Sequence, residues 1–280
     1  MSAKTKRILV PTDFTKVADC AIGHAMKLAE RIGAEVRLLH VVPKPAEAEE
    51  ARKKLAIESE RAKKLNPAVN VEGLVRIGSI FDDIGDAAAE IDAVLIIMGT
   101  HGLRGMQFIT GSRALRVISS SKIPFIVVQE RMIKSDGYRD IVVPLDLEKE
   151  TRQKLTLVAD MAKYFQSKVH LITPKDDDEF LHNQLVRNIN FSKQYLSERG
   201  IEHDAVIAEE DSSDFVKGVI KYAVKVDADL IAIMNLAQEN IFGVLGVPNE
   251  QEIITNEPMI PVMCVNPVST TVAGVPVMFQ

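Results

Sequence analysis

The sequence predicts an α/β protein built from two repeated doubly wound domains, each a five-stranded parallel sheet flanked by helices. Three observations predict this fold class. The chain has 280 residues, which suits two domains of roughly 140 residues better than one. Short apolar runs rich in Val, Ile and Leu alternate with helical stretches, which is typical of parallel strands joined by right-handed crossovers. The same landmarks also occur twice along the chain, in the same order.

The repeat consists of strand-like strings and the residues that follow them. The matched pairs are "RILVPTDF" (7–14) with "DIVVPLDL" (140–147), "VRLLHVVPKP" (36–45) with "VHLITPKDD" (169–177), "AVLIIMG" (93–99) with "DLIAIMN" (229–235), and "IPFIVV" (123–128) with "IPVMCV" (260–265). The first pair matches Pro11 and Asp13 with Pro144 and Asp146. Four landmarks recurring in one order indicate two copies of one domain.

The repeat also predicts where the domains begin and end. We expect a first domain over 1–130, a second over 138–268 and a C-terminal tail over 269–280. The link lies near 129–139, which is charged and contains the turn dipeptide Asp136-Gly137.

The elements within each half follow from apolar periodicity. The predicted strands span 7–11, 35–42, 70–76, 93–98, 124–128, 140–144, 168–173, 202–207, 229–234 and 261–265. The predicted helices of the first half span 15–33, 46–66, 79–91 and 111–121. Thr15 and Ser79 are the expected N-caps of two of them, and Gly33 is an expected stop signal. The dense mixture of charges in 46–66 indicates a helix with a solvated face.

Composition excludes several classes of protein. A formal net charge of -5 and a pI of about 5.8 argue against non-specific nucleic-acid binding, which needs a basic surface. No apolar stretch approaches the ~18 residues of a membrane span, and the opening "MSAKTKRILVPTDF" is not typical of a signal peptide. Cys20 and Cys264 lie far apart with no Cys/His cluster nearby, so we expect a reduced, cytoplasmic protein without a metal site.

Ligands of open α/β sheets bind beyond the carboxyl ends of the strands, where the strand order reverses. Pro11 ends the first predicted strand and Thr12 and Asp13 follow it, Val41 lies near the end of the second, and Met98 ends the fourth. We expect these residues to meet at one edge of the sheet. Asp13 has two interpretations at this point, because a carboxylate after a strand either contacts a ligand or caps the next helix.

A glycine-rich stretch follows the fourth strand. "MGTHGLRGMQFITGSRALRVISSSKIPFIVV" (98–128) matches neither a GxxxxGK[ST] loop nor GxGxxG. It contains Gly99, Gly102 and Gly105, and Gly111-Ser112 then opens a helix. Glycines let backbone N–H groups approach an anion, and a helix N-terminus adds partial positive charge. The Ser112 hydroxyl and the side chains of Arg104 and Arg113 would assist. Phosphate binding and a plain glycine-rich crossover loop both remain open on spacing alone.

Three strings resemble the universal stress protein family: "ILVPTDF", "LLHVVP" and "MGTHG…GS…IPFIVV". With their repeats they make the chain look like a tandem universal stress protein over nearly all of its length. Members that bind ATP are similar to one another in a glycine pattern, G-x2-G-x9-G-[ST]. The matching positions here are Gly99, Gly102, Gly111 and Ser112, with eight instead of nine residues between the second and third glycines.

The resemblance implies a role for each matching residue. Asp13 would accept a hydrogen bond from adenine or orient it, Val41 would offer backbone to the base, and Met98 and Gly99 would lie beside base and ribose. The phosphates would be held by Gly102, Gly111 and Ser112, and the predicted site is completed by Pro11, Thr12 and Arg113. The implied ligand is ATP or AMP, with the presence of Mg²⁺ open. Ala114 stands where the family often has a second hydroxyl, which weakens the triphosphate alternative.

The second half lacks the glycine pattern. Asn235 stands where the first half has Gly99, no Gly-Ser pair opens the next helix, and Gly243 and Gly246 lie in the apolar segment "NIFGVLGVP". We expect this half to keep the fold without the nucleotide. The family's domains resemble dimers paired through their last strands, so the resemblance implies internal pairing of "IPFIVV" with "IPVMCV". A further homodimer and unknown protein partners remain open.

Two functions follow from these observations. The first is a cytoplasmic stress protein that binds an adenine nucleotide in its first half. The alternative is an interaction or scaffold protein that works without nucleotide. No nucleophile–base pair, metal cluster or pair of catalytic carboxylates stands out, so we expect no dedicated enzyme, with slow ATP hydrolysis left open. His40 and His101 are expected to serve packing or hydrogen bonding.

Overall fold

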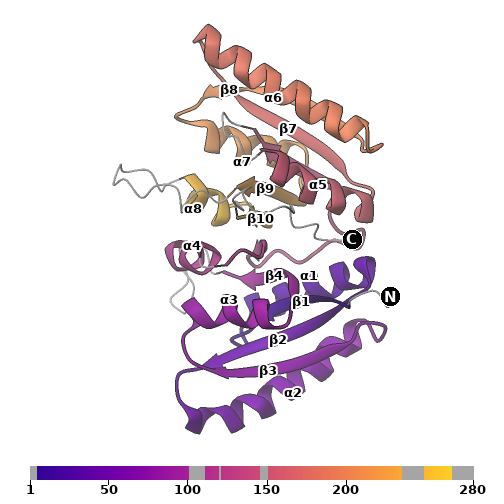
Figure 1. Cartoon of the computed structure of the whole chain (residues 1–280), viewed down its shortest axis with the longest axis vertical. Coiled ribbons are helices and arrows are strands. Elements are labelled where there is room, and N and C mark those ends of the chain that lie inside the picture. The colour runs from indigo at the N-terminus through magenta and orange to yellow at the C-terminus, as the bar shows by residue number, and fades with distance from the viewer. Residues whose placement is uncertain (1–4, 101–110, 120, 146–150, 235–248, 267–280) are drawn as a thin grey trace. The chain divides into compact units, whose positions relative to one another are not determined.

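The computed structural model describes the chain except residues 1–4, 101–110, 120, 146–150, 235–248 and 267–280 (Figure 1). The chain divides into two compact units, with the division between Ile133 and Lys134. Each unit has five strands and its own helices. In the part of the chain that the structure describes, no helix has the length and apolar character needed to cross a membrane.

Unit 1 is built on five parallel strands. They are β1 (Lys6–Pro11), β2 (Ala34–Val42), β3 (Val71–Ile77), β4 (Ala93–Gly99) and β5 (Phe125–Val128), in the spatial order β3-β2-β1-β4-β5. The order runs outward on both sides of the neighbouring strands β1 and β4. The carboxyl ends of these two strands therefore border the point where the winding reverses, which is the usual place for a ligand.

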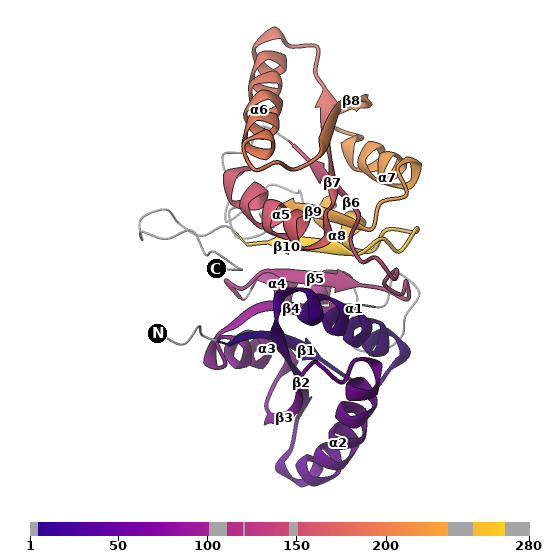
Figure 2. The same ribbon diagram turned by 90° about the vertical axis from the view of Figure 1, so that its right-hand side faces the viewer.

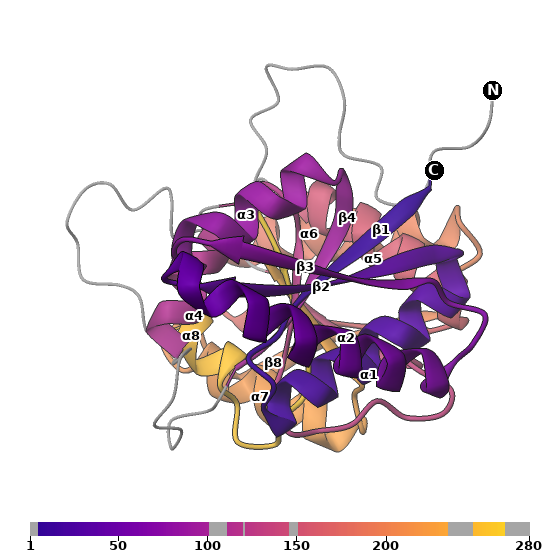
Figure 3. The ribbon, with the colours of Figure 1, turned by 90° about the horizontal axis from the view of Figure 1, so that it is seen from below.

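The helices of unit 1 cover both faces of this sheet. They are α1 (Lys16–Ile32), α2 (Ala48–Leu65), α3 (Ile80–Glu90) and α4 (Gly111–Ser119), with a short 3₁₀ turn η1 (Pro45–Glu47) before α2. α1 contacts α2, and α3 contacts α4. Figure 3 shows α3 on one side of β2 and β3, and α1 and α2 on the other. The doubly wound α/β fold predicted from the sequence is confirmed.

Local signals set the helix ends of unit 1. The Thr15 side chain accepts a hydrogen bond from the N–H of Ala18 at the start of α1, and Gly33 ends the helix with φ 66°. The Ser79 side chain accepts from the N–H of Phe81 at the start of α3. These three caps are confirmed, because each depends on residues close in sequence.

Unit 2 repeats the winding. Its strands are β6 (Asp140–Pro144), β7 (Lys168–Lys175), β8 (His203–Asp211), β9 (Leu230–Met234) and β10 (Val262–Val265), all parallel and in the spatial order β10-β9-β6-β7-β8. Its helices are α5 (Thr151–Phe165), α6 (Glu179–Ser197), α7 (Phe215–Lys225) and the short α8 (Asn249–Ile254). Figure 2 shows α5 and α6 on one side of β7 and α7 on the other.

The registers of the two units match. Pro11 at the end of β1 lies opposite Leu39 of β2, and Pro144 at the end of β6 lies opposite Ile172 of β7. The sequence repeat therefore corresponds to a repeat of backbone pairing.

Several expected element ends need correction. β7 and β8 continue beyond their predicted ends, to Lys175 and Asp211, and α4 ends at Ser119 instead of 121. α2 has the exposed charged face expected for 46–66, and its other face buries six side chains, Glu58 and Ser59 among them. α2 lies close to the sheet at Gly73 of β3, where an added Cβ would come within 2.8 Å of the Leu55 side chain.

Candidate functional site

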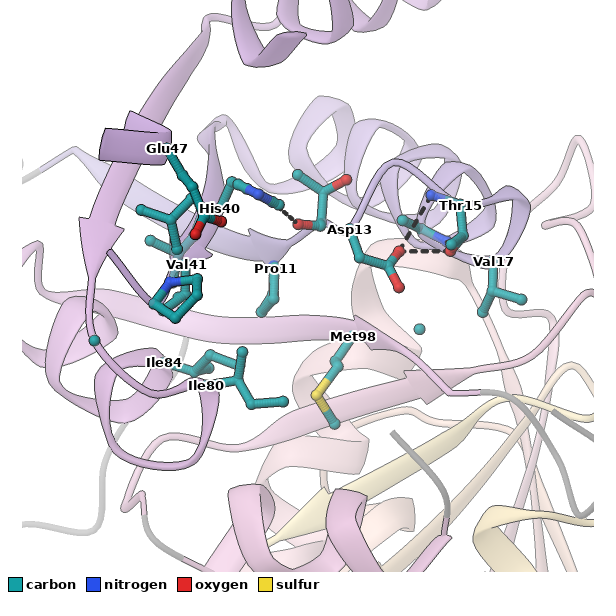
Figure 4. A pocket seen from close by; sticks show the side chains of 17 residues that line it. Pro11, Asp13, Thr15, Val17, His40, Val41, Glu47, Ile80, Ile84 and Met98 are labelled. Carbon is teal, nitrogen blue, oxygen red and sulfur yellow. Dashed lines mark hydrogen bonds between the residues drawn. The ribbon is translucent and has the colours of Figure 1, made fainter. Parts of the chain in front are cut away.

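A cavity of about 480 Å³ lies at the carboxyl edge of the unit 1 sheet (Figure 4). Its walls come from the ends of β1, β2 and β4, the start of α1, the turn η1 and the start of α3. The side chains that make it largely apolar are Pro11, Val17, Val41, Ile80, Ile84 and Met98. The size and the apolar walls suit a small organic ligand.

Six of the ten predicted site residues line this cavity or its rim: Pro11, Thr12, Asp13, Val41, Met98 and Gly99. The structure thus brings together residues from three separate strand ends. Of the other four, Gly111, Ser112 and Arg113 belong to the first turn of α4. Gly102 lies outside the described residues, as do Arg104, Gly105 and His101. The phosphate-binding role of the glycine-rich loop stays a prediction.

The turn after β1 is fixed by hydrogen bonds on both sides. The Thr12 N–H donates to the Leu39 carbonyl at 2.8 Å, and the Thr12 hydroxyl accepts from the Phe14 N–H at 3.1 Å. The Nδ1 of His40 lies 2.7 Å from the Thr12 carbonyl, and its ring packs on Phe14 with centroids 4.5 Å apart. His40 therefore serves hydrogen bonding and packing, as expected.

Asp13 uses one carboxylate oxygen to hold its own turn. Its Oδ1 accepts from the Thr15 N–H at 3.1 Å and from the Thr15 hydroxyl at 2.5 Å. Thr15 in turn caps α1. The capping interpretation thus accounts for Oδ1, whereas no described residue hydrogen-bonds to Oδ2. Because Asp13 lines the cavity, Oδ2 is available to a ligand there.

Gly99 has a packing role that the sequence analysis missed. A Cβ at this position would lie 2.7 Å from Cγ1 of Val17 and 3.0 Å from its carbonyl oxygen. The end of β4 and the start of α1 approach so closely that only glycine fits. Val17 also lines the cavity. No local pattern identifies this contact, since its partners lie far apart in sequence.

The acidic side chains among the described residues that line the cavity have no lysine or arginine beside them in its wall. Asp13 and Glu47 line it, and no lysine or arginine does among the residues that the structure describes. Behind the wall, Glu58 of α2 is 5% exposed. Burial raises the pKa of Glu58, while its interaction with the Thr12 side chain and the charge of Arg61 oppose the rise. No described residue that lines the cavity would therefore balance the charge of an anion.

Side chains that could ligate a metal are known for the described residues of this edge and of the rest of the chain. Within the described ranges, no three His, Cys, Asp or Glu side chains are placed to hold a metal ion. Both cysteines of the chain, Cys20 and Cys264, are buried free thiols.

A family profile and a curated relative each match nearly half of the chain. The profile described as "Universal stress protein family" matches residues 4–129. Universal stress protein MJ0531 of Methanocaldococcus jannaschii is 30% identical over 142 residues, which cover 45% of this chain and 82% of that protein.

Solved structures resemble the chain as well. A universal stress protein from Archaeoglobus fulgidus aligns over 94% of this chain and 97% of its own, with a TM-score of 0.76 and 16% identity. That likeness shows the fold. A second structure from Archaeoglobus fulgidus, a universal stress protein in complex with dAMP, is 24% identical and covers 44% of this chain and 97% of its own, with a TM-score of 0.37.

Proposed function

The chain belongs to the universal stress protein family, and we propose that unit 1 binds one adenine nucleotide, ATP or AMP, in the cavity at the carboxyl edge of its sheet. The observation that carries the proposal is the convergence of Pro11, Asp13, Val41 and Met98 on this cavity. These residues come from three strand ends and match the family pattern. The cavity also borders β1 and β4, where the winding reverses.

The cavity suggests how the nucleotide would lie. Apolar side chains at the Val41 and Ile80 end suit the faces of a base. Oδ2 of Asp13 would accept a hydrogen bond from the ligand, as carboxylates accept only. The glycine pattern begins at Gly99, on the far side of Asp13, so the phosphates would point that way. There they would meet the N–H groups of the loop and of the first turn of α4, which begins at Gly111.

The first test is the content of the protein as purified. We expect the denatured protein to release about one adenine nucleotide per chain, identified by chromatography and mass spectrometry. Calorimetric titration with AMP and with ATP, each with and without Mg²⁺, then ranks the ligands. If millimolar ATP gives neither heat nor a rise in melting temperature, the nucleotide-independent scaffold replaces this proposal.

A paired substitution locates the site. We expect Gly102→Val or Gly111→Val to weaken nucleotide binding at least tenfold, because a side chain would keep the phosphate from the backbone N–H groups. The matched control is Gly243→Val in the second half, which lies in the apolar segment without the glycine pattern. Equal losses in all three variants would contradict a site in unit 1. Circular dichroism and melting temperature separate lost binding from lost folding.

The second part of the proposal concerns unit 2, which we assign to a second universal stress protein domain without a nucleotide. Its strand order and its register at Pro144 support the assignment. The Leu145 N–H donates to the Ile172 carbonyl at 2.7 Å, as the Thr12 N–H does to Leu39. Asp146, Asn235, Gly243 and Gly246 lie outside the described residues, so the lost loop stays a prediction from sequence. Two nucleotides per chain in the first test would contradict it.

Pairing of the two domains through their last strands is proposed on sequence. β5 and β10 consist of apolar residues and Cys264 only, and unpaired apolar edges aggregate. Separately expressed halves should aggregate or dimerise alone and should associate when produced together. Halves that stay monomeric alone and together would contradict the pairing. The molar mass of the whole chain in solution, measured by light scattering, tests whether it forms a homodimer. The protein partners and the cytoplasmic location stay predictions.

We propose no dedicated catalytic activity. Among the described residues of the cavity, His40 is held by the Thr12 carbonyl, and one oxygen of Asp13 is held by Thr15. These groups build the wall. A slow hydrolysis of bound ATP would be measured as phosphate release during prolonged incubation.

A further inference from the structure

The segment 130–132, which follows β5, is held against α1 by three successive residues. The contacting atoms are Lys16 Nζ with a Glu130 carboxylate oxygen at 2.8 Å, His24 Nε2 with the Arg131 carbonyl oxygen at 3.0 Å, and the Cys20 thiol, which donates to the Met132 thioether, with the sulfur atoms 3.3 Å apart. The three residues of α1 are four positions apart, so they share one face of the helix. The segment 130–132 therefore lies along that face, within unit 1.

The two sulfur atoms of this contact differ in their access to solvent. Cys20 is 2% exposed, whereas Met132 is 60% exposed. Burial and the nearby charge of Glu130 raise the pKa of the Cys20 thiol, so the thiol stays protonated and reacts slowly with oxidants. The methyl end of Met132 approaches α1 at Gly23, where an added Cβ would lie 3.5 Å from Cε. Met132 is thus a solvent-accessible thioether in contact with a helix.

This exposure sets Met132 apart from most methionines that the structure describes. Those that are at most 5% exposed are Met26, Met98, Met161, Met234 and Met263. Met259 of unit 2 is 42% exposed, and no described residue forms a hydrogen bond with its sulfur. It is therefore the matched comparison for a thioether that is open to solvent but holds no helix contact of this kind.

We propose that Met132 is a reversible oxidation site, at which hydrogen peroxide converts the thioether into a sulfoxide and thereby releases the segment 130–132 from α1. A lone pair of the sulfur attacks one oxygen of the peroxide, and the O–O bond breaks as the S–O bond forms. The departing hydroxide takes the proton from the transferred oxygen and leaves as water. The sulfur loses two electrons and the peroxide gains them.

The sulfoxide does not keep the contacts of the thioether. The two sulfur atoms are only 3.3 Å apart, so no oxygen atom fits between Met132 and Cys20. The added oxygen therefore points to solvent, where water hydrogen-bonds to it, and the methyl group beside Gly23 becomes part of a polar group. Because solvation of this oxygen draws Met132 away from α1, the neighbouring contact between Arg131 and His24 opens more often.

Trypsin measures the release, because it cleaves after Arg131, at the carbonyl that contacts His24. We expect treatment of the whole chain with hydrogen peroxide to add one oxygen to Met132, located by peptide mass spectrometry, while Cys20 stays a thiol. Cleavage after Arg131 should then be about fivefold faster, since proteolysis follows the population of the opened segment. Methionine sulfoxide reductases of both stereospecificities, with a thiol reductant, should restore the slow cleavage.

Three variants separate this site from general oxidative damage. Met132→Leu keeps the approximate size of the side chain and forms no sulfoxide, so its cleavage should stay slow in peroxide. Met132→Gln carries a polar group at this position and should be cleaved without peroxide as fast as the oxidised wild type. Met259→Leu removes the exposed methionine of unit 2 and should respond as the wild type does. Thermal melting followed by circular dichroism verifies that each variant is folded.

Three results would overturn the proposal. The first is that Met132 stays unoxidised while Met259 forms its sulfoxide. The second is that Met132 is fully oxidised and cleavage after Arg131 keeps its original rate. The third is that peroxide accelerates this cleavage equally in Met132→Leu and in the wild type, since the release would then come from another oxidised residue.

Discussion

The carboxyl edges of the two sheets share a backbone and differ in side chains. In unit 1 the residue after β1 is Thr12, and in unit 2 the matching residue after β6 is Leu145. Both N–H groups donate to the neighbouring strand in the same way, to Leu39 and to Ile172. The strand-end geometry of a doubly wound sheet is therefore kept by main-chain bonds, independently of whether a ligand is bound there.

The side chains around these matching turns have different functions. His40 in unit 1 reaches the Thr12 carbonyl and packs on Phe14 beside a cavity. The matching residue in unit 2 is Thr173, which is 1% exposed. Lys154 of α5 is also buried there, and its ammonium donates to the Pro144 carbonyl at 2.5 Å. In unit 1 the His40 imidazole contacts the end of β1 and a cavity lies beside it. In unit 2 the buried Lys154 side chain contacts the end of β6 instead.

The largest effect should come from placing the residue of unit 2 into unit 1. Gly99→Asn introduces the residue that stands at the matching position 235. Its Cβ would clash with the side chain and backbone of Val17. We expect unit 1 to lose about 3 kcal/mol of stability, the upper range for overpacking, together with nucleotide binding. Urea unfolding and calorimetry measure the two effects.

The control for this substitution is Gly23→Ala. Gly23 lies within α1, and an added Cβ meets Met132 at an ordinary 3.5 Å. Alanine favours helix over glycine by about 1 kcal/mol, so stability should rise slightly. If Gly99→Asn left the unfolding free energy as high as Gly23→Ala does, the close approach to Val17 would not be required.

Residues near in sequence made the fold predictable. Apolar runs bounded by Pro11 or Pro144 located strand ends, and Thr15 and Ser79 located helix starts, because each signal acts within a few residues. Six residues of the candidate site were predicted because local patterns locate the strand ends, and this topology brings three strand ends to one edge. Residues that act through distant contacts were missed.

Glu58 and Val17 illustrate what local patterns omit. Glu58 lies in a dense run of charges, yet it faces inward toward Thr12 because α2 packs closely on the sheet at Gly73. Val17 matters because β4, far along the chain, ends against it. Glu47 likewise lines the cavity, although its charged segment gives no local sign of that position.

A medium effect should appear on acidification, through a buried histidine of unit 1. His24 of α1 is 1% exposed, and its Nε2 lies 3.0 Å from the Arg131 carbonyl. Burial lowers the pKa of His24 to about 4, below the value near 6.5 in an unfolded chain. The unfolded state then binds the proton more readily, so stability falls as the pH drops below about 6.5. At pH 5 the loss should be about 2 kcal/mol relative to pH 7.5.

The substitution His24→Gln tests this assignment. Glutamine retains a donor for the Arg131 carbonyl and does not titrate, so the change in unfolding free energy between pH 7.5 and pH 5 should shrink by about 2 kcal/mol. The control is His182→Gln, at an exposed position on α6 of unit 2, which should leave the pH dependence unchanged. An equal pH dependence in wild type and His24→Gln would mean that other groups titrate with folding.

The smallest expected change in unfolding free energy concerns two threonines near strand ends of the two units, Thr12 and Thr173. The Thr173 hydroxyl is buried and has no hydrogen-bond partner among the described residues, and an unpaired buried hydroxyl costs stability. Thr173→Val keeps the shape and removes the polar atom, so unit 2 should gain about 1 kcal/mol. Thr12→Val in unit 1 removes the acceptor of the Phe14 N–H and should cost about 1 kcal/mol instead. Opposite signs in urea unfolding would show that unit 2 no longer uses the polar contacts that hold the turn of unit 1. Destabilisation by both substitutions would mean that Thr173 is hydrogen-bonded in solution, and the two edges would then be alike in this respect.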